Sequence, residues 1–296
     1  MDDRAWSHPS SSDFLSISAS ARLVYERTPL PELRHFIERV FLGDRTNGVI
    51  AEHCGDSGFR LVSLTSNKAT PLTGAESSLS ALCWYPQGAY KSKGTKRKRG
   101  SSTSVRFDDG RSYFGRAGGK RRGDDVHVEL EHYVRWSQSR FDEAHPRVDP
   151  MTYAVLNAIL DANIKCIDGN RIVYDKTWRR GTALDLLGYK RNTGEAVVFE
   201  VKTGYDACFD EPDTEHPWMR APFDDIANTP LNRARFQALF GAILTERAFG
   251  VHITYCYVIH VASSAKKPVL HGLGPVASYR AQLELSITLS RPLAPK

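Results

Sequence analysis

The chain has 296 residues, of which 41% are hydrophobic and 25% are charged, and these proportions are typical of a globular protein. No apolar run reaches roughly 18 residues, and the first residues do not combine a basic segment with an apolar one, so we expect neither a membrane span nor a secretory signal. The five cysteines are widely spaced and form no Cys-x-x-Cys pair. They predict reduced thiols in an intracellular protein, without a disulfide framework, a zinc site or an iron–sulfur cluster.

Positive charge is concentrated in one segment. The net charge is +6 and the isoelectric point is about 9.0. Twelve Lys or Arg residues lie between Lys91 and Arg122, against only Asp108 and Asp109. Such a field attracts polyanions, so we predict contacts with nucleic acid, with a solvated basic loop as the alternative. The candidates for these contacts are Lys96, Arg97, Lys98, Arg99, Arg121 and Arg122.

The same segment has a second interpretation. Residues 93–100, Lys-Gly-Thr-Lys-Arg-Lys-Arg-Gly, resemble a nuclear localisation signal, which is a basic cluster exposed to a carrier. If the cluster at residues 91–99 is such a signal, the protein acts in the nucleus. Direct binding of DNA by the cluster is the competing interpretation, and the two are compatible.

Residues 1–88 form a predicted accessory region of uncertain α+β structure. Its first 20 residues or so are rich in serine and are expected to be disordered. Apolar periodicity predicts a helix over residues 29–44, and short apolar runs predict strands over residues 61–66 and 81–85. One interpretation of this region is a domain that binds a protein partner. Residues 89–122 follow as a predicted basic, flexible linker, because they are rich in Gly, Ser, Lys and Arg.

Residues 123–296 show a pattern of alternating helices and strands. Helices are predicted over residues 123–138, 149–163 and 228–250, and strands over residues 170–175, 181–189, 196–204, 251–262 and 281–289. Asp149 is the expected N-cap before Pro150, and residues 190–195 are the expected hairpin turn. The pattern predicts an α/β fold with a central mixed sheet that is flanked by helices.

Three charged residues stand in the two strands of the predicted hairpin. Asp185 lies in the first strand, and Glu200 and Lys202 lie two residues apart in the second, so both face the same side of the sheet. An unpaired charge in so apolar a strand is costly, so each group needs a partner or an ion. Two carboxylates can converge on a hard cation such as Mg²⁺, with the carbonyl of Val201 as a further oxygen ligand. The alternative is a solvated hairpin with a Glu–Lys surface pair.

The segment Arg-Arg-Gly-Thr-Ala-Leu-Asp, residues 179–185, together with Phe-Glu-Val-Lys-Thr-Gly, residues 199–204, resembles the core of the PD-(D/E)XK nucleases. The similarity is to the RecB-like and lambda-exonuclease-like branch and extends from Gly123 to about Arg235. It implies a restriction-endonuclease-like core and Mg²⁺- or Mn²⁺-dependent cleavage of DNA that leaves a 5′-phosphate. In this resemblance Asp185 and Glu200 hold the metal, and Lys202 assists the attacking water.

The resemblance also assigns roles on the neighbouring helices. Gly123, Val126 and His127 match a Gly-x-x-hydrophobic-His pattern in which the histidine is a metal ligand; in other branches a glutamate of this helix does so, and Glu131 is the candidate. Gln237 matches a glutamine that contacts substrate. Residues expected to meet phosphates near the start of the same helix are Asn232, Arg233 and Arg235.

The sequence departs from the family pattern at two positions. Leu184 stands where the family often has Pro, and Gly241 stands where RecB-like proteins often have Tyr. The chain also lacks the cysteine set of the iron–sulfur-bearing relatives. Between the hairpin and the helix, Tyr205, Phe209 and Trp218 lie in an acidic, Pro-containing segment that is placed like a flap over a cleft. They can stack on bases or pack the loop onto the body, and packing is favoured.

Together these observations predict a metal-dependent nuclease that hydrolyses DNA, with an exonuclease of replication, repair or recombination as the expected class. A catalytically inactive nuclease fold that only binds nucleic acid is one alternative. A structure-specific endonuclease or an RNA-processing nuclease on the same core is another. RNA therefore remains an alternative substrate, and a membrane partner is not expected.

Overall fold

The computed structural model describes most of the chain. The described residues are 49–54, 58–63, 66, 69–84, 105–106, 112–113, 115–205, 208–263 and 267–290. The predicted disordered segment, the predicted helix over residues 29–44 and the basic residues Lys96, Arg97, Lys98 and Arg99 lie outside the described residues. Among the described residues, no helix has both the length and the apolar character to cross a membrane.

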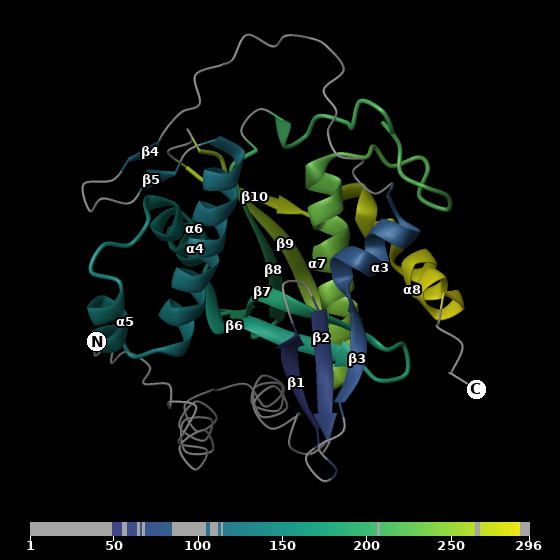
Figure 1. Cartoon of the computed structure of the whole chain (residues 1–296), viewed down its shortest axis with the longest axis horizontal. Coiled ribbons are helices and arrows are strands. Elements are labelled where there is room, and N and C mark those ends of the chain that lie inside the picture. The colour runs from purple at the N-terminus through teal and green to yellow at the C-terminus, as the bar shows by residue number, and fades with distance from the viewer. Residues whose placement is uncertain are drawn as a thin grey trace.

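The elements follow one another in a mixed order (Figure 1). The strands are β1 (Val49–Cys54), β2 (Gly58–Ser63), β3 (Ala69–Gly74), β4 (Val105–Arg106), β5 (Ser112–Tyr113), β6 (Ile164–Asp175), β7 (Arg180–Lys190), β8 (Ala196–Thr203), β9 (Ile253–Val261) and β10 (Val269–Gly272). The helices are α3 (Ala75–Leu82), α4 (Gly115–Arg135), α5 (Gln138–Ala144), α6 (Pro150–Asp161), α7 (Pro230–Phe249), the 3₁₀ helix η2 (Gly274–Tyr279) and α8 (Arg280–Leu289).

The fold is α/β and is built on an eight-stranded mixed sheet. The strand order is β1-β2-β3-β7-β8-β9-β10, and β6 pairs with β7 along its other edge. The pairs β3–β7 and β8–β9 are parallel, and the other pairs in this sheet are antiparallel. Helices α4 and α6 lie on one face, and α7, α3 and α8 lie on the other (Figure 1). The prediction of a mixed sheet flanked by helices is confirmed.

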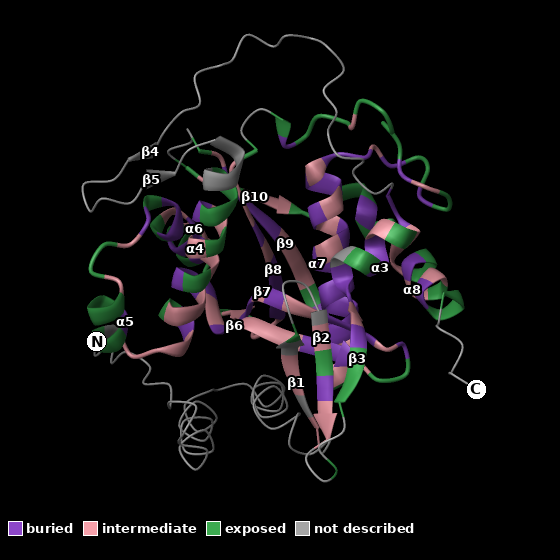
Figure 2. Cartoon of the chain, in the orientation of Figure 1, coloured by how far each residue is buried: buried purple, intermediate pink, exposed green. Residues whose placement is uncertain are grey.

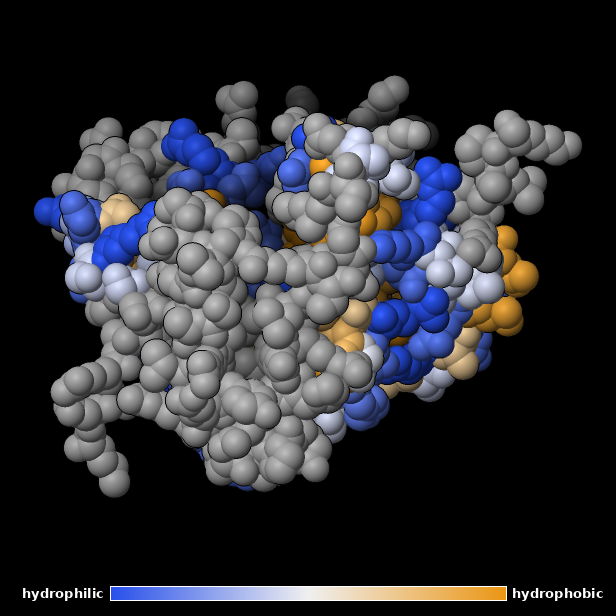
Figure 3. Space-filling model, turned by 90° about the horizontal axis from the view of Figure 1, so that it is seen from below, coloured by the Kyte–Doolittle hydropathy of each residue, from blue (hydrophilic) through white to orange (hydrophobic). Residues whose placement is uncertain are grey.

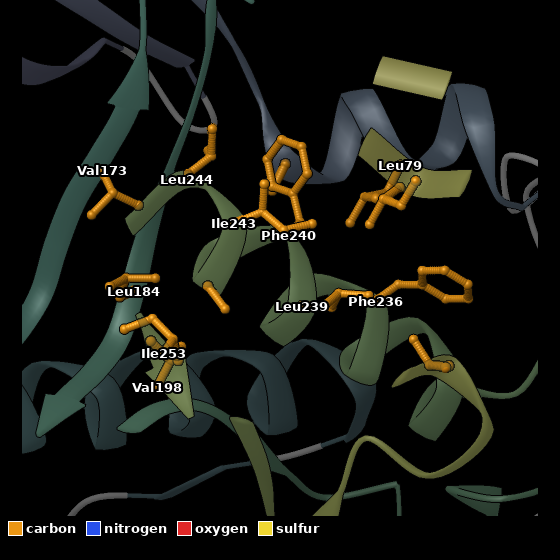
Figure 4. Packing of buried hydrophobic residues seen from close by; sticks show 14 of the residues in the cluster. Leu79, Val173, Leu184, Val198, Phe236, Leu239, Phe240, Ile243, Leu244 and Ile253 are labelled. Carbon is orange, nitrogen blue, oxygen red and sulfur yellow. The ribbon is translucent and has the colours of Figure 1, made fainter. Parts of the chain in front are cut away.

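Two apolar cores hold these layers together. On the α7 face, Leu184 and Val198 of the sheet pack with Phe236 and Phe240 of α7 and with Leu79 of α3 (Figure 4). Helix α7 is buried at 13 of its 20 residues, and Figure 2 shows it as the most deeply buried helix of that face. A helix that is apolar on nearly all sides belongs inside the protein, which explains why the sheet and α3 enclose it.

The second core lies on the opposite face. Val126 and Leu130 of α4 and Val155 of α6 pack against Phe199 and Val201 of β8. Since Val198 belongs to the first core and its neighbours in β8 to the second, the strand alternates between faces as the period of two predicts.

The hairpin and the predicted helix termini agree with the sequence. The turn between β7 and β8 contains Gly194 at φ 75°, the left-handed conformation that glycine accepts without cost. The Asp149 side chain accepts a hydrogen bond from the backbone N–H of Met151 at the start of α6. Helix α7 ends at Gly250, whose φ of 62° is that of a left-handed C-cap.

The predicted strand over residues 281–289 is wrong because that segment is helical, and the first two residues of the predicted strand over residues 81–85 belong to a helix. Residues 75–82 form α3, which runs into the predicted strand at 81–85, and residues 280–289 form α8. In α8, Leu283 and Ile287 are buried, four residues apart, while Leu285 is 59% exposed. A strand would place all three on one face, so the burial follows the helical period. Apolar residues in α3 show the same spacing at Ala75, Leu79 and Cys83.

This difference predicts a contrast between two leucines of α8. Leu283→Ala should lower the free energy of unfolding by about 2–5 kcal/mol, because Leu283 is fully buried in the first core. Leu285→Ala should change it by less than about 0.5 kcal/mol, since Leu285 lies at the surface. Urea unfolding of both variants measures the contrast, and equal losses would contradict the helical assignment.

The right-hand edge of Figure 3, the side on which α8 lies in Figure 1, carries hydrophobic residues at the surface.

The segments predicted as accessory region and linker contribute to the main body. Strand β3 pairs with β7 at Thr73 opposite Arg180, and α3 packs in the first core. Helix α4 begins at Gly115, so residues 115–122 are helical where a flexible linker was predicted. Residues 69–84 and 115–290 therefore share one sheet and its cores as far as the structure describes them.

Candidate active site

The candidate site lies where β8 separates from β7. Strand β8 pairs with β7 only from Leu186 to Tyr189, and on the same edge β3 pairs only with Arg180 and Gly181. Asp185 is the first residue of β7 beyond the paired part, so its side chain stands at the fork between the strands. Its Oδ2 accepts a hydrogen bond from the backbone N–H of Val201 in β8, at 2.6 Å. Neither β8 nor β3 is paired with β7 at Asp185, so there is space between the strands for its carboxylate.

His127 of α4 reaches Asp185 from the side. Its Nδ1 lies 3.3 Å from Asp185 Oδ1. The two residues are far apart in the sequence, and the structure brings them together. Glu200 and Lys202 form the other half of the cluster, with 2.6 Å between Lys202 Nζ and Glu200 Oε1.

The pKa values show that the four groups share one electrostatic environment. Burial raises the pKa of Glu200 to about 7, and the nearby Asp185 charge adds to this effect. Burial also works to raise the pKa of Asp185, but His127, Lys202 and the Val201 N–H outweigh it and hold that pKa below its usual value. Burial lowers the pKa of His127, but the charge of Asp185 and its hydrogen bond raise it, and the net change is upward. For Lys202, burial is outweighed by Glu200 and Asp185, so its pKa lies well above the usual value.

Two glycines let α4 lie close enough to the sheet for His127 to reach the site. A Cβ added at Gly123 would lie 2.8 Å from Thr203 Oγ1 at the end of β8. A Cβ added at Gly169 in β6 would lie 3.0 Å from the Cα of Glu131 in α4. The contact at Gly123 is too short unless Thr203 shifts, and the contact at Gly169 is tight, so the glycine of the Gly-x-x-Val-His pattern has a steric reason.

Gly123→Ala should therefore displace α4 and lower any activity that depends on His127. We expect a loss of roughly 10- to 100-fold in rate, because small displacements of catalytic groups are costly, and a loss of stability of about 1–3 kcal/mol from overpacking. Initial rates and urea unfolding measure the two effects.

The same helix supplies a control. A Cβ added at Gly119 meets no atom within 4 Å, so Gly119→Ala should keep the activity and stabilise the protein by up to about 1 kcal/mol. Thr203→Ala should partly rescue Gly123→Ala by removing the clashing oxygen. Equal behaviour of the two glycine variants would refute the steric account.

The two glutamates near His127 have other partners. Glu131 binds Arg135 Nη1 at 2.6 Å and Asn170 Nδ2 at 2.9 Å, in a network that includes Asp168. Glu129 is buried and accepts hydrogen bonds from the Asp149 N–H and the Thr152 hydroxyl. The helix glutamate of other branches therefore has an internal partner here, and His127 is the α4 residue at Asp185.

The two departures from the family pattern lie against each other. A Cβ at Gly241 would lie 2.7 Å from Leu184 Cδ2 and 3.9 Å from Val198 Cγ1. Leu184 thus occupies the space that a larger residue at position 241 would need.

Gln237 lies one turn before Gly241 on the same side of α7. This helix runs antiparallel to β8, because it forms the crossover from β8 to the parallel strand β9. One helical turn and two strand residues are of similar length, so we expect Gln237 to lie over the part of β8 that holds Glu200.

The other residues predicted on α7 bind within the protein. Asn232 is buried and hydrogen-bonds the Ala227 carbonyl. Arg233 binds Asn228 Oδ1 and Asp213 Oδ2, and Arg235 binds the Gly272 carbonyl and Asn232 Oδ1. These contacts hold the preceding loop and β10 to the start of α7, a role that the sequence did not predict. Contact of the three side chains with phosphates remains a prediction.

Arg122 corrects one predicted contact with nucleic acid. Its guanidinium is buried and binds both oxygens of Asp149, each at 2.8 Å. A side chain in this position contradicts the prediction that Arg122 meets a phosphate backbone. Arg121 and Lys120 are exposed on the same helix.

One buried residue beside the site was missed. His260 of β9 is opposite Lys202 in the register, and its Nε2 donates to the Gly204 carbonyl at 2.7 Å. A histidine among the apolar residues of this predicted buried strand was the available signal, since a buried polar group needs a partner.

The donor set fits a hard divalent cation. Within the described residues, no group of three or more His, Cys, Asp or Glu side chains is arranged to hold a metal ion. Mg²⁺, however, is commonly held by one or two carboxylates, with waters and substrate phosphates completing its shell. Asp185 and Glu200 are two hard carboxylates close enough for the charge of one to raise the pKa of the other. A cation between them would remove this repulsion.

No family model matches the chain, and no curated protein matches it.

Proposed function

We infer that the protein is a metal-dependent nuclease with a restriction-endonuclease-like core, and that it hydrolyses DNA phosphodiester bonds. The observation that carries this proposal is the meeting of Asp185, Glu200 and Lys202 at the fork between β7 and β8, with His127 against Asp185. The sequence resemblance assigned roles to these four residues, and the contacts among them support that assignment.

Each residue has a distinct role in the proposed reaction. Lys202 stays protonated near neutral pH because its pKa is raised, so it acts as a fixed positive charge beside the attacking water and the phosphate. Asp185 is kept ionised by His127 and by the Val201 N–H, and it orients that side of the site. Water displaces the 3′-oxygen at phosphorus, and the products are a 3′-hydroxyl and a 5′-phosphate.

Asp185 and Glu200 are the two carboxylates that would hold Mg²⁺ or Mn²⁺, and the sequence resemblance adds His127 as a ligand from α4. When bound, the ion supplies positive charge that stabilises the developing negative charge on the phosphate oxygens. The Val201 carbonyl is the further candidate ligand that the sequence proposed.

The basic segment supports binding of the phosphate backbone. Lys120 and Arg121 are exposed on α4 ahead of His127, and the cluster at residues 91–99 precedes them in the chain. Cations of this kind give affinity without base specificity, so binding should weaken as the salt concentration rises.

The test is cleavage of end-labelled linear and circular DNA, single- and double-stranded, by the wild-type protein with Mg²⁺, Mn²⁺ or EDTA. Cleavage that requires the metal supports the proposal, and survival of circles identifies an exonuclease. Salt-sensitive binding without cleavage under any metal would replace the proposal with an inactive binding module. Cleavage of RNA alone would move it to RNA processing.

A further inference from the structure

Tyr205 holds an unusual backbone conformation beside the candidate site. It follows Lys202 by three residues, and its φ is +62°, directly after Gly204 at φ +81°. Among the described residues, four other than glycine have positive φ; two are asparagines, and Tyr205 is the one aromatic. Asn and Gly accept this conformation readily, whereas a tyrosine is strained in it. Such strain persists only where the surroundings enforce it, and it is common at functional sites.

Hydrogen bonds and ring contacts fix the loop around Tyr205. The Gly204 carbonyl accepts from His260 Nε2, and the Tyr205 carbonyl accepts from the N–H of Cys208 at 2.8 Å. Phe209 stacks on His260, with ring centroids 3.9 Å apart, and the Tyr205 ring leans on Phe209 at 5.6 Å. The rings of His260, Phe209 and Tyr205 thus form an aromatic column. Its inner end is His260, which lies in β9 opposite Lys202 of β8.

The outer end of the column is exposed. Phe209 is buried, whereas Tyr205 is 52% exposed. If the column served only to pack the loop, the buried Phe209 would be sufficient. A strained and exposed tyrosine beyond it would add little to the packing. An exposed, rigidly backed ring beside a phosphate-binding lysine is suited to stacking on a nucleobase.

We propose that Tyr205 is the platform on which an unpaired base stacks next to the scissile phosphate. This inference rests on the proposed function and names its substrate class. A base can lie on a protein ring only after it has left its own helical stack. The site therefore takes a single strand or a frayed end in preference to a fully paired one.

The test compares Tyr205→Asn and Tyr205→Phe with the wild type. Asn accepts the left-handed conformation, so Tyr205→Asn should fold at least as stably as the wild type while it lacks the ring. Tyr205→Phe keeps the ring. Tyr153→Ala is the control, because Tyr153 on α6 is an equally exposed tyrosine, at 53%.

The probes are short single-stranded oligodeoxynucleotides with 2-aminopurine at the 5′ or the 3′ end, titrated in EDTA. We expect the wild type, Tyr205→Phe and Tyr153→Ala to quench the fluorescence of one probe. Tyr205→Asn should bind roughly 5- to 100-fold more weakly, without that quenching. In cleavage assays with Mg²⁺, Tyr205→Asn should raise KM more than it lowers kcat and should lose the preference for frayed over blunt ends.

The outcomes separate the two proposals. Cleavage and quenching by Tyr205→Asn at the wild-type level would overturn the stacking role and leave the nuclease intact. Wild-type quenching without cleavage would overturn the nuclease but support the platform. Failure of the wild type to bind either oligonucleotide would overturn the platform itself.

Discussion

Asp185→Asn is expected to lower the rate of metal-dependent cleavage by about three orders of magnitude. The asparagine oxygen can still accept from the Val201 N–H, so the fork between β7 and β8 should keep its geometry. The charge that would hold the cation and that pairs with His127 is lost. Several kcal/mol of transition-state stabilisation depend on that charge, which corresponds to a loss of this order. Initial rates on end-labelled DNA with Mg²⁺ measure it.

The stability of the same variant distinguishes a damaged site from a damaged fold. Asp185→Asn removes the attraction of His127 and Lys202 together with the repulsion of Glu200, so its unfolding temperature should fall by only a few degrees. Asp161→Asn, at the exposed end of α6, is the matched control and should keep full activity. Wild-type cleavage by Asp185→Asn would remove Asp185 from the mechanism.

Asp149→Ala is expected to cause the largest loss of stability. Asp149 is fully buried, binds Arg122 through both oxygens and caps α6 through the Met151 N–H. Its removal leaves a buried guanidinium without its carboxylate, which costs about 3–5 kcal/mol, and the lost cap adds about 1 kcal/mol. Since domains are stable by only about 5–15 kcal/mol, the variant should be near its limit of folding. Urea unfolding measures the loss.

Two further variants divide this effect. Asp149→Asn keeps a capping oxygen and loses the charge, so its loss should be smaller than that of Asp149→Ala. In the double variant Arg122→Met with Asp149→Ala, no unpaired charge remains, and much of the stability should return. A loss below about 1 kcal/mol in Asp149→Ala would show that the buried pair contributes little.

The sequence predicted the parts of the fold whose signals are local. Asp149 before Pro150, Gly194 in the hairpin and Gly250 after α7 each act within one turn of chain, and all three stand where they were expected. The strand assignment of α8 failed because Leu283, Leu285 and Ile287 fit both a period of two and part of a helical period. Only burial by distant elements distinguishes the two.

For the candidate site too, the sequence predicted the local features and missed those that depend on distant residues. The spacing of Glu200 and Lys202 is local, and the predicted pair lies on one strand face. The fork that frees Asp185 depends on where β3 and β8 begin and end against β7, which no local pattern records. Arg122 was misassigned because its partner Asp149 is 27 residues away, so its charge appeared to belong to the exposed basic segment.

If the cluster of Asp185, Glu200 and Lys202 hydrolyses DNA as proposed, removing the lysine alone should abolish cleavage. Wild type and Lys202→Ala are incubated with end-labelled linear DNA at low salt, with Mg²⁺ or with EDTA, and product release is followed. Lys190→Ala, which removes another lysine of the sheet, is the control. We expect Mg²⁺-dependent cleavage by the wild type and the control and at least about a hundredfold less by Lys202→Ala. Equal cleavage by Lys202→Ala, or none by the wild type, would contradict it.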